Sequence, residues 1–250
     1  MAIAAALQGL FLGLGRSTGA AAFNLEGELQ VPALLLDPCF SADQEGLITD
    51  FRVGGQTLMC SDQGVGWKLW HAQSALEGSR AIGLPVPANT KVSVSGTLVA
   101  AGTIVAGIGV DPIPPGEARV PNSPEVADRL NYVFGLGSVA VPAGGDAFLA
   151  ATCKRECTLG PLVLWSPTAA AAFDVTVENV EINNKPMPAG RVSGANIDRG
   201  PLTYFDFLRT DLDGRTLNAE CGYNHSVAVK LHNFNGGPIT VYGGILVLPE

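Results

Sequence analysis

Cys221 and His225 are the two residues whose types and spacing come nearest to an active site. A cysteine activated by a neighbouring histidine is a common nucleophile, and both residues stand at the start of an expected strand, Ser226 to Leu231. No motif supplies a third residue to orient the imidazole, and none supplies an oxyanion loop. The sequence also lacks the serine-hydrolase elbow, the zinc-protease motif, the P-loop and the dinucleotide fingerprint. We therefore expect no enzymatic activity and no cofactor.

Two further segments contain residue types that bind metals. Cys153-Lys-Arg-Glu-Cys157 is a Cys-x3-Cys, but no second cysteine or histidine pair lies at zinc-site spacing. Asp211-Leu-Asp213-Gly214 places two carboxylates before a glycine, as calcium loops do. The remaining EF-hand positions are missing, so a type I turn is the favoured interpretation. No metal site is predicted.

The cysteines indicate a reduced protein. They are odd in number and scattered, which argues against a disulfide framework. We expect reduced, mostly buried side chains that pack as small apolar groups, and reduced cysteines are typical of synthesis in the cytosol. The five are Cys39, Cys60, Cys153, Cys157 and Cys221.

Charge is scarce in this chain. Charged residues make up 15% of its 250 residues, against about 25% in a typical globular chain. Either polar loops cover a well-buried β protein, or copies of the chain cover one another's apolar surface; we favour the second. The net charge of −8 and the lack of any Lys or Arg run exclude nucleic-acid binding through a basic surface.

Residues 1–21 are expected to form a short N-terminal helix. The first fourteen residues are uncharged and almost entirely apolar, and the first charge, Arg16, follows them. A secretory signal has its cationic region first, so a cleaved signal is only the alternative, and the stretch is too short to span a membrane. Four side chains at i, i+3, i+4 and i+7 would form one helix face, which we predict to lie on a partner subunit or a membrane surface. They are Leu7, Leu10, Phe11 and Leu14.

The segment from Ile48 to Gln56 recurs at Val177 to Lys185. Both copies alternate apolar and polar residues, as a half-buried strand does. In both, a pair of residues that tolerate positive φ follows the strand, Gly54-Gly55 or Asn183-Asn184. This pattern predicts a tight hairpin in each copy, and a duplicated β unit.

Further matches occur in the same order along the two halves. Many short strands without long helices between them favour a β-sandwich over a parallel α/β sheet. The second half is longer, and its extra residues are expected as an insertion at Ala150 to Ala172. The matched segments are 23–31 with 132–142, 67–76 with 202–208 (both aromatic and helical candidates), 89–94 with 224–229, and 107–112 with 244–249.

These matches predict two β-domains in tandem. Five prolines lie between Pro112 and Pro124, and a proline-rich segment acts as a semi-rigid spacer. The predicted parts are the N-terminal helix at 1–21, a first domain at 22–112, a linker at 113–129 and a second domain at 130–250.

The tandem units resemble a known family. Each has a strand and hairpin of the type Ile-x-Asp-Phe-x-Val-Gly-Gly and a closing Val-x-Val strand pair. In this they resemble the double jelly-roll major capsid proteins of tailless icosahedral viruses, including the membrane-containing tectivirus and corticovirus groups. The resemblance covers residues 22–249 and is architectural. It implies an all-β fold of two jelly rolls, and the apolar N-terminus resembles the family's inward-pointing terminus.

The resemblance also implies an assembly. Three copies of a two-domain chain present six similar barrels, so the expected oligomer is a homotrimer with a pseudo-hexameric outline. Its implied partners are itself, neighbouring capsomers, penton or minor capsid proteins and an internal viral membrane, without direct nucleic-acid binding. The implied location is the capsid of the virion, after synthesis in the host cytoplasm.

Two other classes of function are open on the sequence. A tandem jelly-roll carbohydrate- or receptor-binding protein, such as a lectin or a virion spike, would use an exposed Trp67, Trp70 or Trp165 as a sugar platform. A cupin-like enzyme would need a cluster of metal-binding histidines, and the three histidines are scattered.

Overall fold

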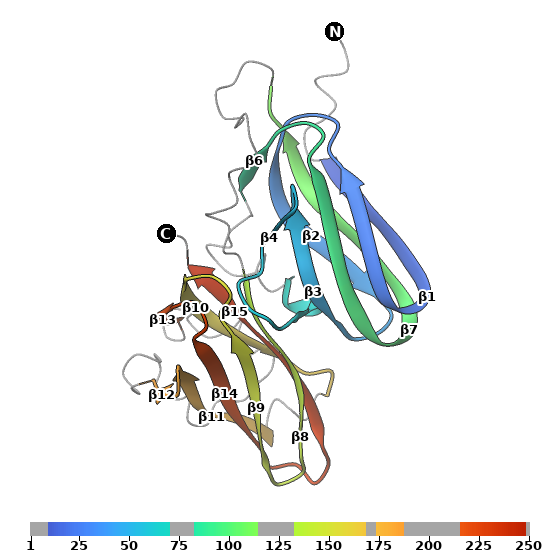
Figure 1. Ribbon diagram of the computed structural model, residues 1–250. Coiled ribbons are helices and arrows are strands. Elements are labelled where there is room, and N and C mark those ends of the chain that lie inside the picture. The colour runs from blue at the N-terminus through green and yellow to red at the C-terminus, as the bar shows by residue number, and fades with distance from the viewer. Residues whose placement is uncertain (1–9, 71–82, 115–132, 169–173, 188–215, 249–250) are drawn as a thin grey trace. The chain divides into compact units, whose positions relative to one another are not determined.

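Two compact β units make up the chain. The computed structural model describes residues 10–70, 83–114, 133–168, 174–187 and 216–248. The first unit consists of Met1–Leu58 and Gln73–Leu130, and the second of Met59–Ala72 and Asn131–Glu250. Antiparallel strands dominate the described part of both units (Figure 1). The all-β class predicted from the sequence is therefore confirmed, and the several sheets are consistent with a β-sandwich.

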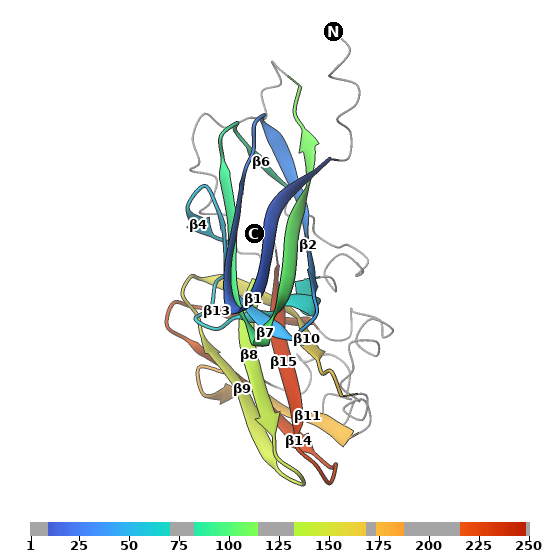
Figure 2. The same cartoon turned by 90° about the vertical axis from the view of Figure 1, so that its right-hand side faces the viewer.

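Among the described residues of the second unit from 133 onward, eight antiparallel strands form a ribbon that is folded back on itself. Counted along the chain, the first pairs with the eighth, the second with the seventh, the third with the sixth and the fourth with the fifth. Pairing of the third with the eighth and of the fourth with the seventh completes two sheets (Figure 2). The strands are β8 (Val133–Val141), β9 (Asp146–Thr152), β10 (Cys157–Trp165), β11 (Val175–Ile182), β12 (Lys185–Pro186), β13 (Thr216–Cys221), β14 (Ser226–Asn233) and β15 (Ile239–Leu248). The sheet orders are β13-β10-β15-β8 and β12-β11-β14-β9.

The first unit has the same six pairings in fewer, longer strands. Its strands are β1 (Leu10–Glu28), β2 (Ala33–Ala42), β3 (Gly46–Val53), β4 (Gln56–Thr57), β6 (Leu84–Val86) and β7 (Lys91–Pro112). β1 pairs with β7 along its length, so β1 corresponds to β8 and β9 together and β7 to β14 and β15 together. β2 pairs with β6 and β7, and β3 pairs with β4 and β7. Every pairing of the second unit thus has a counterpart here.

The hairpin predicted in both copies has one geometry. β3 and β4 flank Gly54-Gly55, β11 and β12 flank Asn183-Asn184, and all four turn residues have positive φ, as a two-residue type I′ turn requires. The first turn residue donates its N–H to Lys91 O at 2.8 Å in the first unit and to Ser226 O at 2.7 Å in the second. The tight hairpins predicted from the sequence are confirmed.

Three register shifts also recur at equivalent places in the two units. A bulge leaves one residue unpaired and bends its strand, so shared bulges show that the two units repeat in backbone detail as well as in pairing. In the first unit the shifts lie between Ile48 and Asp50, Leu35 and Pro38, and Gly13 and Gly15. In the second they lie between Val177 and Asn179, Leu159 and Leu162, and Gly135 and Gly137.

The helix predicted for residues 1–21 is wrong from residue 10 onward, where the chain forms β1. This segment pairs with β7, and Leu12 lies opposite Ile108. The strand pairing prevails over the helical spacing of the segment's apolar residues. Glycines also disfavour a helix by about 1 kcal/mol each, and Gly13 and Gly15 both lie in this stretch. Residues 1–9 lie outside the described residues.

The match of segment 23–31 with 132–142 is also wrong. By register, residues 11–18 correspond to 133–140, and residues 23–28 correspond to 147–152. Sequence reasoning missed this because β1 continues where the second unit has a turn between two strands. The insertion predicted at Ala150 to Ala172 is also misplaced. Most of that stretch forms β9 and β10, and both strands have counterparts in the first unit.

Residues 59–72 were predicted to lie in the first domain, but they belong to the second unit. Cys60 donates its N–H to Val133 O at 3.1 Å, and Gly137 donates its N–H to Gly64 O at 2.8 Å. This stretch includes β5 (Val65–Gly66) and a helical turn at residues 67–70. The rest of the aromatic helical candidates, at 71–76 and 202–208, lies outside the described residues, as does the predicted linker from residue 115 onward.

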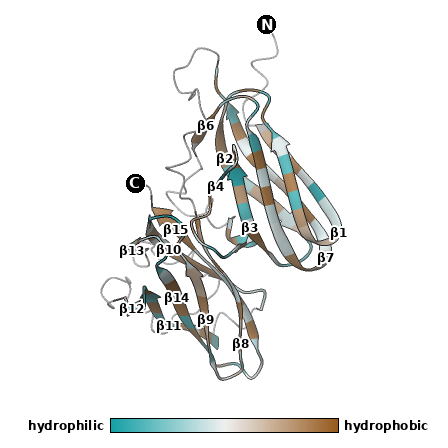
Figure 3. Cartoon of the chain, viewed as in Figure 1, coloured by the Kyte–Doolittle hydropathy of each residue, from teal (hydrophilic) through white to brown (hydrophobic). Residues whose placement is uncertain are grey.

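Strand alternation places an apolar row inside each unit. In β14, Val227, Val229 and Leu231 are fully buried, while the residues between them are partly exposed. Figure 3 shows the same alternation of hydrophobic and hydrophilic residues along the strands of both units. One face of each strand therefore packs in the core, and the opposite face is exposed at the surface.

Candidate functional site

Phe11 is the exposed member of the predicted N-terminal face. Its side chain is 67% exposed, whereas Leu14 is buried in the core. Leu10 begins β1, and Leu7 lies outside the described residues. A partner- or membrane-facing role for these residues stays a prediction. Of the two whose side chains are described, Phe11 is exposed and available for such a contact, and Leu14 is not.

The tryptophans do not form the open platform that a lectin would need. Trp67 and Trp70 are buried, and Trp165 is partly buried. Lys68 Nζ lies 4.4 Å from the Trp165 ring centroid and 5.3 Å from that of Trp67. The ammonium of Lys68 thus occupies one face of each of these two rings in a cation–π contact.

The Cys221–His225 pair is not arranged for nucleophilic catalysis. His225 Nδ1 accepts the Gly222 N–H at 3.1 Å. Hydrogen bonding with Cys153 and burial raise the pKa of Cys221, which keeps this cysteine protonated. The calcium-loop candidate, Asp211 to Gly214, lies outside the described residues.

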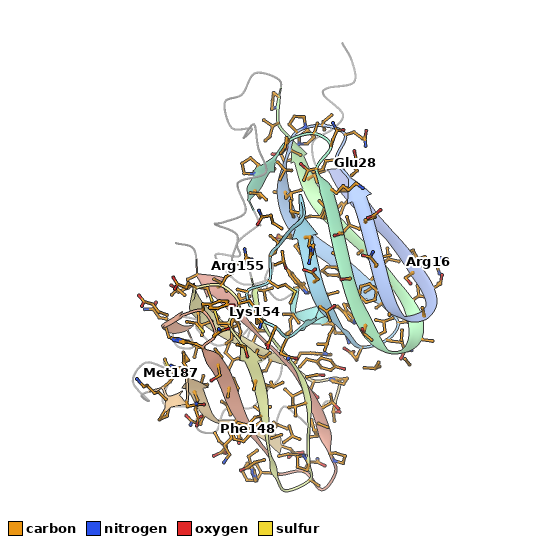
Figure 4. All side chains as sticks on the ribbon, viewed as in Figure 1. Arg16, Glu28, Phe148, Lys154, Arg155 and Met187 are labelled. Carbon is orange, nitrogen blue, oxygen red and sulfur yellow. The ribbon has the colours of Figure 1, made fainter. Side chains whose placement is uncertain are left out.

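Charged and aromatic side chains gather on the exposed face of the sheet β12-β11-β14-β9, which we call the outer face. β9 presents Asp146 and Phe148 there, and Phe148 is 51% exposed. β14 presents Lys230 and His232 beside them, in register: Phe148 is opposite Lys230 and Asp146 is opposite His232. Figure 4 labels Phe148 on β9.

Asp146 is the electrostatic centre of the outer face. Its carboxylate contacts Lys230 Nζ at 2.7 Å and His232 Nδ1 at 2.5 Å. Two hydrogen bonds lower the pKa of Asp146: the one with Lys230 has the larger effect, and the one with His232 has the smaller. The hydrogen bond between Asp146 and Lys230 also raises the pKa of Lys230. The two groups therefore hold each other ionised at neutral pH.

Phe234 completes the outer face. Its ring stands edge-on to His232, with ring centroids 4.3 Å apart, and it is 63% exposed. Two exposed aromatic rings thus lie near a carboxylate that is paired with an ammonium and an imidazole. Such a surface fits a partner with both apolar and hydrogen-bonding groups. Sequence reasoning missed it, because residues 146–152 (Asp-Ala-Phe-Leu-Ala-Ala-Thr) do not alternate between polar and apolar types and do not indicate which face of β9 is exposed.

We expect the Lys230→Met substitution to raise the pKa of Asp146, because it removes the main hydrogen-bond donor to that carboxylate. A lowered carboxyl pKa contributes stability above the unfolded value near 3.8, and this contribution disappears as pH falls through the folded-state pKa. NMR titration of the carboxyl carbon measures the shift. Lys185→Met, at an exposed lysine of β12, is the control. An Asp146 pKa that responds equally to both substitutions would contradict the pairing.

Comparison with known proteins gives no assignment: no family model matches the chain, and no curated protein sequence matches it. Within the residues that the structure describes, helices long and apolar enough to cross a membrane are absent.

Proposed function

We propose that this chain is the major capsid protein of an icosahedral virus and that each of its units is a jelly roll. The observation that carries the proposal is the set of pairings shared by the two units. A jelly roll is an eight-stranded, two-sheet fold. The pairing of first with eighth, second with seventh, third with sixth and fourth with fifth strands is what results when one long hairpin is rolled up.

Duplication supports a trimer through symmetry. A chain with two similar units, repeated around a threefold axis, presents six similar units to its neighbours, and closed cyclic oligomers are the common outcome for soluble chains. The low charge content of 15% suits a protein whose surface is covered by copies of itself. The same proposal implies neighbouring capsomers, penton or minor capsid proteins and an internal viral membrane as partners, and the virion as location.

Both units carry exposed apolar side chains that fit such contacts. Large exposed apolar groups mark interaction sites when they gather with polar neighbours. The outer face, with its two phenylalanines, is the strongest example in the second unit. The exposed residues are Phe11, Val31, Val99 and Val105 in the first unit and Phe148, Tyr223 and Phe234 in the second.

Solution mass tests the proposal. We expect the purified chain to sediment at three times the 25.8 kDa of one copy, and negative-stain images to show particles with a six-lobed outline. A stable monomer would contradict the trimer. A monomer that also bound glycans on an array, and lost that binding in a Phe148→Ser variant, would favour the carbohydrate- or receptor-binding alternative.

A further inference from the structure

Four of the five cysteines meet in the second unit, which their scattered positions in sequence do not suggest. Cys153 follows β9, Cys157 begins β10, Cys221 ends β13 and Cys60 comes from the stretch 59–72. All four are buried and free, while Cys39 is exposed on β2 in the first unit.

The thiols of these cysteines are in mutual contact. The Cys153 thiol donates to Arg155 O at 2.7 Å and to Cys221 O at 3.5 Å. The thiols of Cys157 and Cys221 lie within hydrogen-bonding reach of Cys153, and that of Cys60 lies within reach of Cys157. Cys157 is also the direct cross-strand partner of Cys221. Across the cluster, the Lys154 N–H donates to Cys60 O at 2.7 Å.

A short surface turn covers the pair Cys153 and Cys157. Lys154 and Glu156 of this turn are exposed, and Arg155 is partly exposed; Figure 4 labels Lys154 and Arg155. Short surface turns belong to the segments that open at the lowest free energy, so local opening of this turn is the route by which we expect a small reagent to reach the pair.

The duplication shows that packing does not require sulfur at these positions. By register, Cys153, Cys157 and Cys221 correspond to Leu29, Ala33 and Val86 of the first unit. Aliphatic side chains thus fill the same places in the other copy. The presence of three cysteines in one copy only, with Cys60 beside them, points to sulfur chemistry rather than to core filling.

Cys153 is the thiol best prepared to react. Hydrogen bonds from Cys157 and Cys221 lower the pKa of Cys153, and the hydrogen bond with Cys153 raises the pKa of Cys157. The thiolate is the nucleophilic form of cysteine. Cys153 is therefore the cysteine of the cluster that loses its proton most readily, and the neighbouring thiols can act as its partner.

We propose that Cys153 and Cys157 are a redox modification site that hydrogen peroxide converts to a disulfide. The Cys153 thiolate attacks a peroxide oxygen and becomes a sulfenic acid, while the other oxygen leaves as hydroxide and takes up a proton. Cys157 loses its proton and attacks the Cys153 sulfur, and the hydroxyl departs as water. In total, two thiols and one peroxide give one disulfide and two waters. Metal chemistry is not proposed, because no cluster of potential ligands suited to a metal ion occurs among the described residues.

Peptide mapping of the intact protein tests this directly. The folded chain is treated with peroxide, its remaining thiols are alkylated under denaturing conditions, and it is digested with trypsin without reduction. Lys154 and Arg155 separate Cys153 from Cys157, and each of the five cysteines falls on its own tryptic peptide. We expect the peptide ending at Lys154 to be joined to the one beginning at Glu156, with the other three cysteines alkylated.

Matched variants make the result decisive. Cys39→Ser should leave the linked peptide unchanged, and Cys153→Ser should abolish it while the other four cysteines are all alkylated. Full alkylation of the treated wild type, or a link between any other pair, would overturn the proposal. Zinc retained by the purified protein at one equivalent would also overturn it. None of these outcomes depends on the capsid proposal.

Discussion

Replacing Gly135 with alanine is expected to destabilise the second unit by about 3 kcal/mol, because the new methyl group would be forced against backbone atoms. A Cβ at this position would lie 2.3 Å from Gln63 O and 2.5 Å from Gly64 O. Both oxygens belong to the stretch 59–72, which must move away if the methyl group is to fit. With about 2–4 °C lost per kcal/mol in a chain of this size, thermal unfolding should show the effect clearly.

The duplication supplies the control for this experiment. Gly13 occupies the equivalent place in the first unit, where a Cβ would meet nothing within 4 Å. Gly13→Ala should therefore leave the unfolding temperature almost unchanged. Equal losses in the two variants would mean that a property of the strand itself, rather than the packing of residues 63 and 64, requires glycine. Hydrogen exchange of the Gly137 amide, which bonds to Gly64 O, locates the damage.

The elements that were predicted correctly from the sequence are specified by residues that lie close together in the chain. The two hairpins depend on residues that lie next to each other, Gly54-Gly55 and Asn183-Asn184, with alternating strands before them. The predicted match of segment 89–94 with 224–229 is also correct, because Asn89 and Asn224 both have positive φ at equivalent turns. A turn that needs positive φ restricts the residue types at that position, mainly to Gly and Asn, so it can be recognised in a single sequence.

The features that sequence missed depend on long-range contacts. The apolar residues in segment 10–21 have the spacing of a helix face, but the segment pairs instead with the 22-residue strand β7. Nothing local to Cys60 indicates that it packs beside Cys157, 97 positions further on. The outer face depends on the register of β9 against β14, which sets Phe148 opposite Lys230. Tertiary pairing overrides local propensity in each case.

The two copies of the unit differ in the residues that fill their cores. Equivalent positions carry Leu29, Ala33 and Val86 in the first unit and cysteines in the second, and Leu98 in the first unit corresponds to Asn233 in the second. All of these positions are buried, so the two copies have diverged in the chemistry of their interiors while they keep the same strand pairings.

The Asn233→Asp substitution is expected to destabilise the second unit by about 3–5 kcal/mol at pH 7, because it places an unpaired charge in the interior. Asn233 is fully buried. Its Nδ2 donates to Val141 O at 3.1 Å and to Gly237 O at 2.9 Å, and its Oδ1 accepts the Asn235 N–H at 2.9 Å. A carboxylate would direct an oxygen with no proton at two carbonyl oxygens.

The loss from Asn233→Asp should depend on pH in a definite direction. Burial raises the folded-state pKa of the new carboxyl above its unfolded value of about 3.9. The destabilisation therefore grows as pH rises from the unfolded value to the folded one, and it shrinks in acid, where a protonated carboxyl can donate to one of the two carbonyls. Asn24→Asp makes the same chemical change at an exposed position of β1 and should cost little at any pH. Urea unfolding of both variants at pH 4 and pH 7 measures the difference, and equal stabilities at pH 7 would show that the Asn233 amide is not the donor that holds these two carbonyls.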